Sequence, residues 1–467
     1  MVSGRELGCT SDSNGCGERV LFSRISEEGR EEALDRVFPT FVRNMSRVHH
    51  STRGFLSQFI GRQGLWMLAS HGAVKVLGFA AVVAVTRMVT EADYGLYAYA
   101  MGLVASAVPF MGFGAYQAFV RFSALAPSQL AKFSLHRHAM GWGLLGSVAL
   151  SLLISLLAPW ICRDLPESAS VLGVLAWVIV STFIFEHTKG LARALHLNRM
   201  SAQVDLTFAV LLVAGAYIGA RTIGIQGYAF AVVLSPIVAS LPFMIRLNAH
   251  RMTGGRVHQG MEGFWSYGLN TAIGGMFGQA LFAVDIFMLG RLWVESPDDL
   301  AIYRVAWLIP LATQVMPSAV AATDFVRNAA MADDAAGIRS YVLQYWKSFG
   351  LVSLVGLSVA AALAPWLLSI FGPGYPRGAQ WMQIMLVGVL GAHLLRIPMG
   401  NLLSALGRAR WNTWTSAAVL VLAGVGCAWR IPSDGLLGAA QVMAFMLWVN
   451  GLISLALVWH HMRLAQR

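Results

Sequence analysis

Apolar runs of about 20 residues succeed one another along the chain from position 63 onward, and short polar segments separate them. A bilayer core about 30 Å thick requires about 20 apolar residues per helix, so these runs have the length of membrane spans. Inside lipid the backbone must satisfy its own hydrogen bonds, which only helices and closed barrels achieve, and barrel strands would alternate in polarity. The pattern therefore predicts an all-α integral membrane protein with about 12 transmembrane helices, over residues 63–87, 94–120, 138–162, 168–188, 203–220, 226–246, 264–290, 300–326, 346–371, 380–404, 411–430 and 435–459.

Composition supports the same class. Hydrophobic residues make up 57% of the 467 residues and charged residues only 12%, whereas soluble domains carry about 25% charged residues. The net charge of +11 does not indicate a nucleic-acid partner, because the cations are dispersed between the apolar runs. The sequence has no zinc-type cysteine spacing, Walker A motif or catalytic triad pattern. We therefore expect no metal, no cofactor and no enzymatic activity.

Lys and Arg are distributed unevenly over the loops. Every second loop is cationic, with Arg121, Lys132 and Arg137, then Lys189, Arg193 and Arg199, then Arg246, Arg251 and Arg256, then Arg327, Arg339 and Lys347, then Arg408 and Arg410. The alternate loops hold about one cation each, namely Arg163, Arg221, Arg291, Arg377 and Arg430. Cationic loops remain on the cytoplasmic side of a membrane, so a multi-pass protein with both termini in the cytoplasm is expected.

The segment ahead of the first apolar run, residues 1–62, is expected to be a largely disordered cytoplasmic tail. It mixes Arg with Glu and Asp, as in SEEGREEALDR, and has no apolar run near Met1 that would indicate a secretory signal. Mixed charge without apolar periodicity does not predict packing, so we expect residues 1–44 to be dispensable.

An internal repeat is visible in the tetrapeptide LAPW, which occurs at 157–160 and again at 363–366, an offset of 206 residues. Beyond LAPW the offset becomes 211, which aligns Ala194 with Ala405. Further matches share these two registers: FVR at 119–121 with FVR at 325–327, Asp93 with Asp299, Tyr97 with Tyr303, Arg199 with Arg410, Gly224 with Gly435, and Gly227 with Gly438. The chain therefore contains two copies of about six helices each.

The repeat predicts a two-lobed organisation. We expect an N-terminal six-helix lobe over 63–250, a cytoplasmic linker over 251–262, and a C-terminal six-helix lobe with a short cytoplasmic tail over 263–467. An even number of spans per copy preserves orientation, so the two lobes are related by an axis along the membrane normal. This layout is typical of secondary transporters, which bind their cargo in the cleft between the lobes.

Several motifs resemble those of a known family. The first hairpin, TRMVTEADYGLYAYAMGLVASAVPFMGFGAYQAFVRF, resembles the opening of polysaccharide-export flippases of the Wzx type, in the multidrug/oligosaccharidyl-lipid/polysaccharide superfamily. The stretches YGLNTAIGGMFGQALFAVDIFMLGRL, IYRVAWLIPLATQVMPSAVA, IFGPGYPRGAQWMQIMLVGVLG and LLSALGRAR are similar to the second half of that family. The resemblance covers roughly residues 60–460, and the long N-terminal tail departs from it.

This resemblance implies transport of an undecaprenyl-diphosphate-linked oligosaccharide, such as an O-antigen or other polysaccharide repeat unit, across the bacterial inner membrane from the cytoplasmic to the periplasmic leaflet. The implied partners are the lipid-linked oligosaccharide, membrane lipids, and a polysaccharide polymerase or export proteins. A lipopolysaccharide or polysaccharide biosynthesis role follows from the same resemblance.

Ionisable residues inside the predicted spans are the candidate site residues. A charge at mid-bilayer costs about 2.5–3.5 kcal/mol on insertion scales, so such groups usually face the bundle interior or a wet cavity. Lys75 lies near the middle of the first span with His71 at i,i+4, and Arg396 lies in the tenth span with His393 at i,i+3. A lipid diphosphate requires fixed cations, so Lys75 and Arg396 are candidate substrate ligands, against an alternative role in packing or snorkelling.

Other charges have a competing structural interpretation. Arg304 is a third candidate cavity cation, but Asp285 lies across the same short hairpin, so an Asp285–Arg304 ion pair competes with a substrate role. Asp285, His71 and His393 are also possible coupling-ion residues, although buried histidines more often serve packing. Three further acidic residues lie near cytoplasmic helix ends, Glu186, Asp205 and Asp324. We expect them to pair with Lys189, Arg199 or Arg327, with a coupling role as the lesser alternative.

Three other functions remain open. Within the same fold, a cation-coupled drug exporter or a flippase for the peptidoglycan precursor would fit the sequence, although cavity cations favour an anionic cargo. A membrane glycosyltransferase or polymerase is the more distant alternative. Such enzymes resemble one another in having a large outer loop with catalytic residues, whereas every outer loop here is short, as in RDLPES, ESPDD and GPGYPRG.

Overall fold

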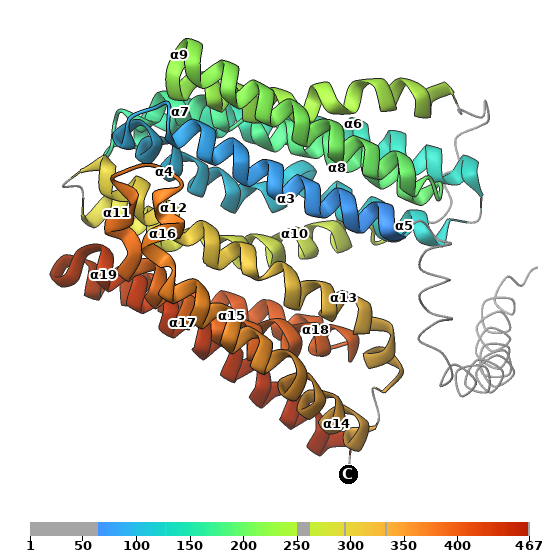
Figure 1. Cartoon of the computed structure of the whole chain (residues 1–467). Helices are drawn as coiled ribbons and strands as arrows, with labels where there is room; N and C mark the ends of the chain where they lie inside the picture. The colour runs from blue at the N-terminus through green and yellow to red at the C-terminus, as the bar shows by residue number, and fades with distance from the viewer. Residues whose placement is uncertain (1–63, 127, 250–261, 294–295, 332–333, 466–467) are drawn as a thin grey trace, which may run out of the picture. The chain divides into compact units, whose positions relative to one another are not determined.

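The structure is a computed structural model that describes residues 64–126, 128–249, 262–293, 296–331 and 334–465, and residues 66–467 belong to one compact unit (Figure 1). Every regular element in these ranges is helical. Eight of the described helices are long and apolar enough to cross a membrane, and a bent pair would make nine. The prediction of an all-helical membrane protein is confirmed, whereas the count of 12 spans stays a prediction. The predicted tail, 1–62, and most of the predicted linker lie outside the described residues.

The helices of the two predicted halves follow the same order. The first half contains α3 (Gly64–Thr86), α4 (Glu91–Ala107), η2 (Val108–Gly114), α5 (Ala115–Leu125), α6 (Gln129–Ile161), α7 (Ser168–Leu175), α8 (Val178–Ala194) and α9 (Asn198–Ala249). The second half contains α10 (Phe264–Ala280), α11 (Val284–Leu292), α12 (Pro297–Thr313), α13 (Val315–Ala330), α14 (Ala335–Tyr345), η3 (Trp346–Gly350), α15 (Leu351–Ala362), α16 (Ala364–Ser369), η4 (Tyr375–Gly378), α17 (Ala379–Gly391), η5 (Ala392–Arg396), α18 (Ile397–Ala405) and α19 (Ala409–Ala465).

Helix caps repeat in the same register as the sequence. The Thr90 hydroxyl accepts the Asp93 N–H at the start of α4, and 206 residues later the Ser296 hydroxyl accepts the Asp298 N–H at the start of α12. Such side chains satisfy N–H groups that the first helical turn leaves free. Helices α8 and α18 end alike, with Ala194 and Ala405 followed two residues later by a residue of positive φ. Each copy therefore encodes its own helix boundaries locally.

The last element of each half is a hairpin of two helices. Helix α9 breaks at Gly224 (φ 64°) and α19 breaks at Gly435 (φ 55°). A Cβ added at Gly219 would lie 2.3 Å from the Gly227 carbonyl oxygen, so the two arms of α9 approach backbone to backbone. Positive φ and this close approach both require glycine. The breaks coincide with the boundaries predicted from the apolar runs in these two regions.

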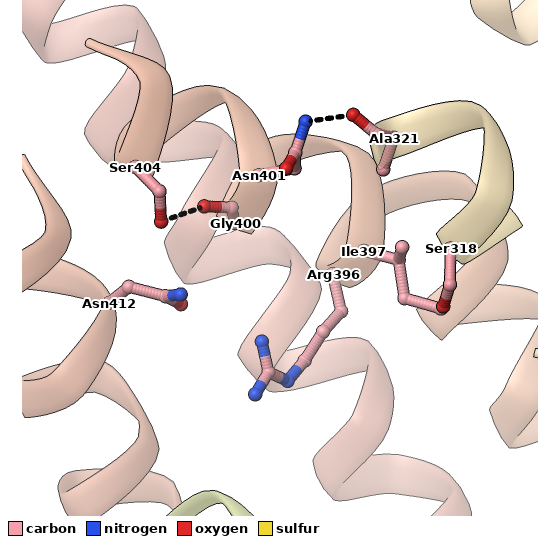
Figure 2. A pocket seen from close by; sticks show the side chains of 8 residues that line it. All are labelled: Ser318, Ala321, Arg396, Ile397, Gly400, Asn401, Ser404 and Asn412. Carbon is pink, nitrogen blue, oxygen red and sulfur yellow. Dashed lines mark hydrogen bonds between the residues drawn. The ribbon is translucent and has the colours of Figure 1, made fainter. Parts of the chain in front are cut away.

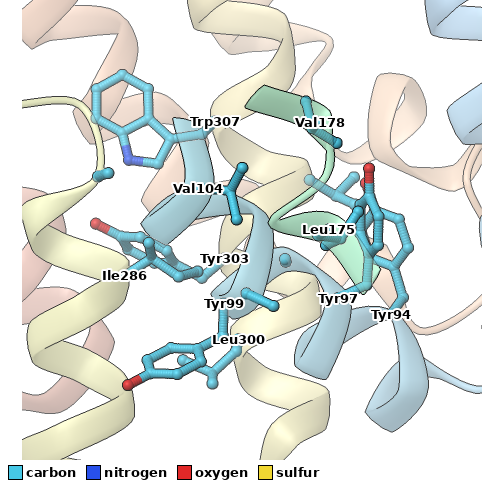
Figure 3. Packing of buried hydrophobic residues seen from close by; sticks show 14 of the residues in the cluster. Tyr94, Tyr97, Tyr99, Val104, Leu175, Val178, Ile286, Leu300, Tyr303 and Trp307 are labelled. Atoms are coloured by element: carbon cyan, nitrogen blue, oxygen red, sulfur yellow. The ribbon is translucent and has the colours of Figure 1, made fainter. Parts of the chain in front are cut away.

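Helices α4 and α12 occupy equivalent positions in the repeat and pack on each other. A Cβ at Gly95 would lie 1.8 Å from the Pro297 carbonyl oxygen, so no larger residue fits this crossing. Figure 3 shows the aromatic side chains of this core, among them Tyr99 and Tyr303, which are fully buried. The two halves therefore share one continuous core at this crossing.

The first helix of the second half lies against the first half. Helix α10 packs on α5 and η2, and it also packs on α19 (Figure 1). A Cβ at Gly114 would lie 2.0 Å from the Gly268 carbonyl oxygen, and the Arg121 guanidinium lies 4.4 Å from the centre of the Tyr267 ring. Helix α10 therefore joins the two halves along its length.

Candidate functional site

A polar pocket in the second half contains Arg396. The pocket has a volume of about 340 Å³, and α13, η5, α18 and α19 line it with Ser318, Ala321, Arg396, Ile397, Gly400, Asn401, Ser404 and Asn412. Figure 2 shows the Arg396 side chain leaving its helix, with the guanidinium directed towards the helix that carries Asn412. The lining residues include one cation and no carboxylate.

The Arg396 guanidinium has few partners in this pocket. Its Nη2 donates one long hydrogen bond, 3.3 Å, to the Ser416 hydroxyl. Its Nε is buried and has no hydrogen-bond partner among the described residues. An unpaired buried charge is costly, and guanidinium groups bind carboxylates and phosphates through paired N–H groups. The arrangement is therefore suited to an anion.

His393, one turn before Arg396, is satisfied within the protein. Its Nε2 lies 3.3 Å from the Thr313 hydroxyl, and its Nδ1 lies 3.3 Å from the Ser353 hydroxyl. Because Thr313 donates its own proton to the Pro310 carbonyl at 2.7 Å, Nε2 is assigned as the donor to the Thr313 hydroxyl. The imidazole is 3% exposed and does not belong to the pocket lining, which favours the packing role over the coupling role.

Asp285 is fully buried and contacts aromatic donors. Its Oδ2 accepts hydrogen bonds from the Tyr303 hydroxyl at 2.8 Å and from Trp307 Nε1 at 2.7 Å, and its Oδ1 accepts the Ile286 N–H. The alternative of an ion pair with Arg304 is not found among the salt bridges of the described residues, and Arg304 Nη1 is buried without a hydrogen-bond partner there. These hydrogen bonds connect α11 with α12, which favours a structural role for Asp285.

Of the remaining two candidates, Lys75 and His71, the structure describes only the Lys75 side chain. Lys75 is exposed on α3 and does not belong to the pocket lining. The side chain of His71 lies outside the part of the chain whose side chains the structure describes. A joint Lys75–Arg396 site stays a prediction.

A charged network that the sequence indicated only in part lies in the first half. Lys189 is 7% exposed, with Nζ 2.9 Å from Glu186 and 2.8 Å from Asp205. Arg193 lies 3.5 Å from Glu186 and donates to the Tyr116 hydroxyl at 2.9 Å. The predicted pairing of Glu186 and Asp205 with Lys189 is confirmed. Tyr116 was not predicted, because it is 70 residues from Glu186 in the chain.

Two loops from different halves contact each other, the loop before α4 and the loop that contains η4. Arg377 Nη2 lies 2.8 Å from Glu91 Oε2, and Arg87 Nε donates to the Ile370 carbonyl at 2.8 Å. A second cavity of about 610 Å³ lies between these loops. No sequence signal indicated the Glu91–Arg377 pair, which spans 286 residues.

No group of three or more His, Cys, Asp or Glu side chains that could hold a metal ion occurs among the described residues. The polar lining of the Arg396 pocket also includes Asn401, Ser404 and Asn412, which sequence reasoning missed. Their counterparts in the first half, at an offset of 211, include Arg193, so the repeat carried a signal that could have located this region.

Comparison with known proteins assigns the chain to a family. Residues 60–323, more than half of the chain, match the profile of the polysaccharide biosynthesis protein family. The chain belongs to this family. No curated protein matches the chain.

Solved structures support the same fold. The chain is similar to a multidrug resistance MATE family transporter of the MOP superfamily in an inward-facing conformation, with a TM-score of 0.69, 15% identity, and coverage of 84% of this chain and 95% of that one. It is also similar to the lipid II flippase MurJ in an inward closed conformation, with a TM-score of 0.67, 13% identity, and coverage of 85% and 87%. A third similar structure is a MOP superfamily transporter from Pyrococcus furiosus, with a TM-score of 0.62, 16% identity, and coverage of 87% of this chain and 96% of that one. This polysaccharide biosynthesis family member therefore has the MOP transporter fold, as predicted.

Proposed function

We propose that this protein is a flippase that moves undecaprenyl-diphosphate-linked oligosaccharide from the cytoplasmic to the periplasmic leaflet of the bacterial inner membrane. Membership in the polysaccharide biosynthesis protein family supports a role with polysaccharide precursors. The main observation in favour of an anionic cargo is the environment of Arg396. Its Nε is buried without a hydrogen-bond partner among the described residues, and no carboxylate lines the pocket. The diphosphate of the carrier lipid is the anionic group of such a substrate, and its oxygens can accept charge-assisted hydrogen bonds.

The same pocket argues against the drug-exporter alternative. A cationic drug would require an acidic or aromatic partner, and the eight lining residues include neither. The similarity to MATE transporters concerns the fold, which hosts different cargoes. The peptidoglycan-precursor alternative shares the diphosphate chemistry and is separated from our proposal by the sugar, so the experiment below must identify the glycan.

We propose that transport proceeds by alternating access between the two halves. The repeat relates the halves in the way found in secondary transporters. The loops at Glu91 and Arg377 hold the halves together at the end that the loop charges place outside. The fold is shared with transporter structures in inward-facing and outward-facing conformations, which supports a cycle between two such states. Lys75 on α3 would then meet the diphosphate during loading, with Arg396 as its second ligand.

The deciding experiment asks on which leaflet lipid-linked oligosaccharide accumulates in a deletion strain. Spheroplasts and inverted vesicles of the same strain are treated with a glycosidase that does not cross membranes, and the protected glycan is identified by mass spectrometry. We expect accumulation on the cytoplasmic leaflet and its relief by the wild-type gene. Arg396→Gln should reduce relief about tenfold or more, because a hydrogen bond to a charged group contributes about 1.5–3 kcal/mol.

Arg221→Gln is the matched control, since Arg221 is exposed on α9 and bonds only to Tyr217 one turn away among the described residues. It should restore export fully. If only a peptidoglycan precursor accumulates in the deletion strain, that precursor and not the oligosaccharide is the transported substrate. An even distribution of all lipid-linked glycans in the deletion strain would refute the flippase proposal.

A further inference from the structure

The Arg396 pocket and the charged network of the first half occupy equivalent positions in the repeat. At the offset of 211 residues that relates Ala194 to Ala405, each charged member of the network has a counterpart in the second half. The pairs are Glu186 with Ile397, Lys189 with Gly400, Arg193 with Ser404, and Asp205 with Ser416. The structure supports this register, because the C-terminal ends of α8 and α18 form the same hydrogen bonds, from Leu197 N to Ala192 O and from Arg408 N to Leu403 O, both at 2.8 Å.

In the first half the network is complete and neutral. Two cations, Lys189 and Arg193, face two carboxylates, Glu186 and Asp205, at distances of 2.8–3.5 Å. Buried charges are tolerated when they are paired in this way. This region therefore has no remaining charge to offer a ligand.

In the second half all four charged residues are replaced, and a cation enters from another position, Arg396. The four counterparts are uncharged, and Ile397, Gly400 and Ser404 line the cavity. Arg396 comes from the position equivalent to Phe185, whose ring lies 4.4 Å from Lys189 Nζ. A Cβ at Gly400 would lie 3.5 Å from Arg396 Nη1, so the guanidinium lies where the first half has Lys189.

We infer that an anionic phosphate group of the ligand takes the place of the two missing carboxylates and completes this network only when it is bound. The inference rests on the proposed function for the identity of the anion as a diphosphate, and it adds which residues of the second half surround the charged group. Ser416 occupies the position of Asp205, and its hydroxyl accepts the hydrogen bond from Arg396 Nη2 at 3.3 Å. The Asn412 side chain, whose Oδ1 has no partner among the described residues, completes the lining.

The test supplies the missing carboxylate from the protein itself. Full-length protein in detergent is titrated calorimetrically with inorganic pyrophosphate and, separately, with farnesyl diphosphate. We expect the wild type to bind and Ser416→Asp to weaken binding of both probes about tenfold or more, because the new carboxylate pairs with Arg396 and repels the anion. Ser416→Asn has nearly the same volume as Ser416→Asp but no charge, so it should weaken binding clearly less than Ser416→Asp does. Tighter binding of farnesyl diphosphate than of pyrophosphate would identify the lipid rather than free phosphate as the source of the anion.

A second pair of variants guards against misfolding of Ser416→Asp. Ile397→Glu restores the counterpart of Glu186 and should also weaken binding, and Ile397→Gln, of similar volume without the charge, should weaken it clearly less. Thermal unfolding of each variant is measured in the same detergent. Equal binding by the Asp and Asn variants, equal loss in both, or no binding of either probe by the wild type would overturn the inference. Binding with the expected charge dependence, but no accumulation of lipid-linked glycan in the deletion strain, would instead overturn the proposed function and leave the site intact.

Discussion

Removing either charge of the Glu91–Arg377 pair should loosen the contact between the halves on the side that carries residues 369–377. Arg377 Nη2 lies 2.8 Å from Glu91 Oε2, and Arg377 Nε donates to the Gly374 carbonyl at 3.1 Å. Glu91 fits there only because residue 374 is glycine, since a Cβ at this position would lie 1.8 Å from Glu91 Oε1. The pair joins α4 of one half to η4 of the other, so it contributes to holding the halves together.

The expected magnitude follows from solvent exposure. The two side chains are 61% and 25% exposed, and exposed ion pairs contribute about 0.2–1 kcal/mol. Loss of the pair should therefore increase the ratio of molecules whose halves are separated at this end to molecules whose halves are in contact there by about 1.4- to 5-fold. Because the pair is exposed, high salt should produce the same shift in the wild type and little change in the variants.

The assay is the labelling rate of Thr86→Cys by a membrane-impermeant maleimide, in a background without the native cysteines. Thr86 lines the cavity between the two loops and is 5% exposed. Glu91→Gln and Arg377→Gln should each raise the rate, and the double variant should raise it no further, because the pair is lost only once. Arg430→Gln is the control, since it breaks the Arg430–Asp434 pair within α19. Additive effects of the two single variants, or a slower rate in either, would refute the reasoning.

Four further predictions test the fold and the topology. Gly219→Ala should lower the stability of the α9 hairpin by about 1–3 kcal/mol, whereas Gly78→Ala, with no atom within 4 Å of the new Cβ, should not; thermal unfolding in detergent compares them. Asp285→Ala should destabilise the protein by about 1–3 kcal/mol because Tyr303 and Trp307 lose their acceptor. Asp285→Asn keeps an acceptor oxygen and should recover most of that stability, so an equal effect of both variants would count against the hydrogen-bond explanation. Ser433→Cys should be labelled only from outside and Arg410→Cys only from the cytoplasm, both being exposed. A chain that begins at Met45 should complement a deletion strain, and loss of export at normal abundance would show that residues 1–44 matter.

Much of the fold was predictable from local sequence. Apolar runs gave the helices, and the glycines at 224 and 435 marked the turns of α9 and α19 because positive φ is a local property of the residue. The repeat was predictable because each copy carries its own caps, such as Thr90 and Ser296.

The site was predictable only in part. Arg396 could be selected from the sequence because it is a charge inside a predicted span. That no carboxylate lies beside it depends on how α13, α18 and α19 come together, which no single segment encodes. For the same reason, the sequence could not decide between Tyr303 and Arg304 as the partner of Asp285. These residues are neighbours in the chain, and only the rotation of α12 about its axis places the tyrosine hydroxyl at the carboxylate.

The position of α10 has a consequence for how the protein is made. Synthesis proceeds from the N-terminus, so α3 to α9 enter the membrane before α10 exists. Until then, the face of α5 and η2 that α10 covers lacks its partner, including the backbone contact of Gly114 with Gly268. The first half therefore exists for a time with the α10-binding face of α5 and η2 uncovered. This face is covered when α10, in the seventh predicted span, has been synthesised. Expressed alone, the first half should be a substrate for membrane proteases, and co-expression of the second half should protect it.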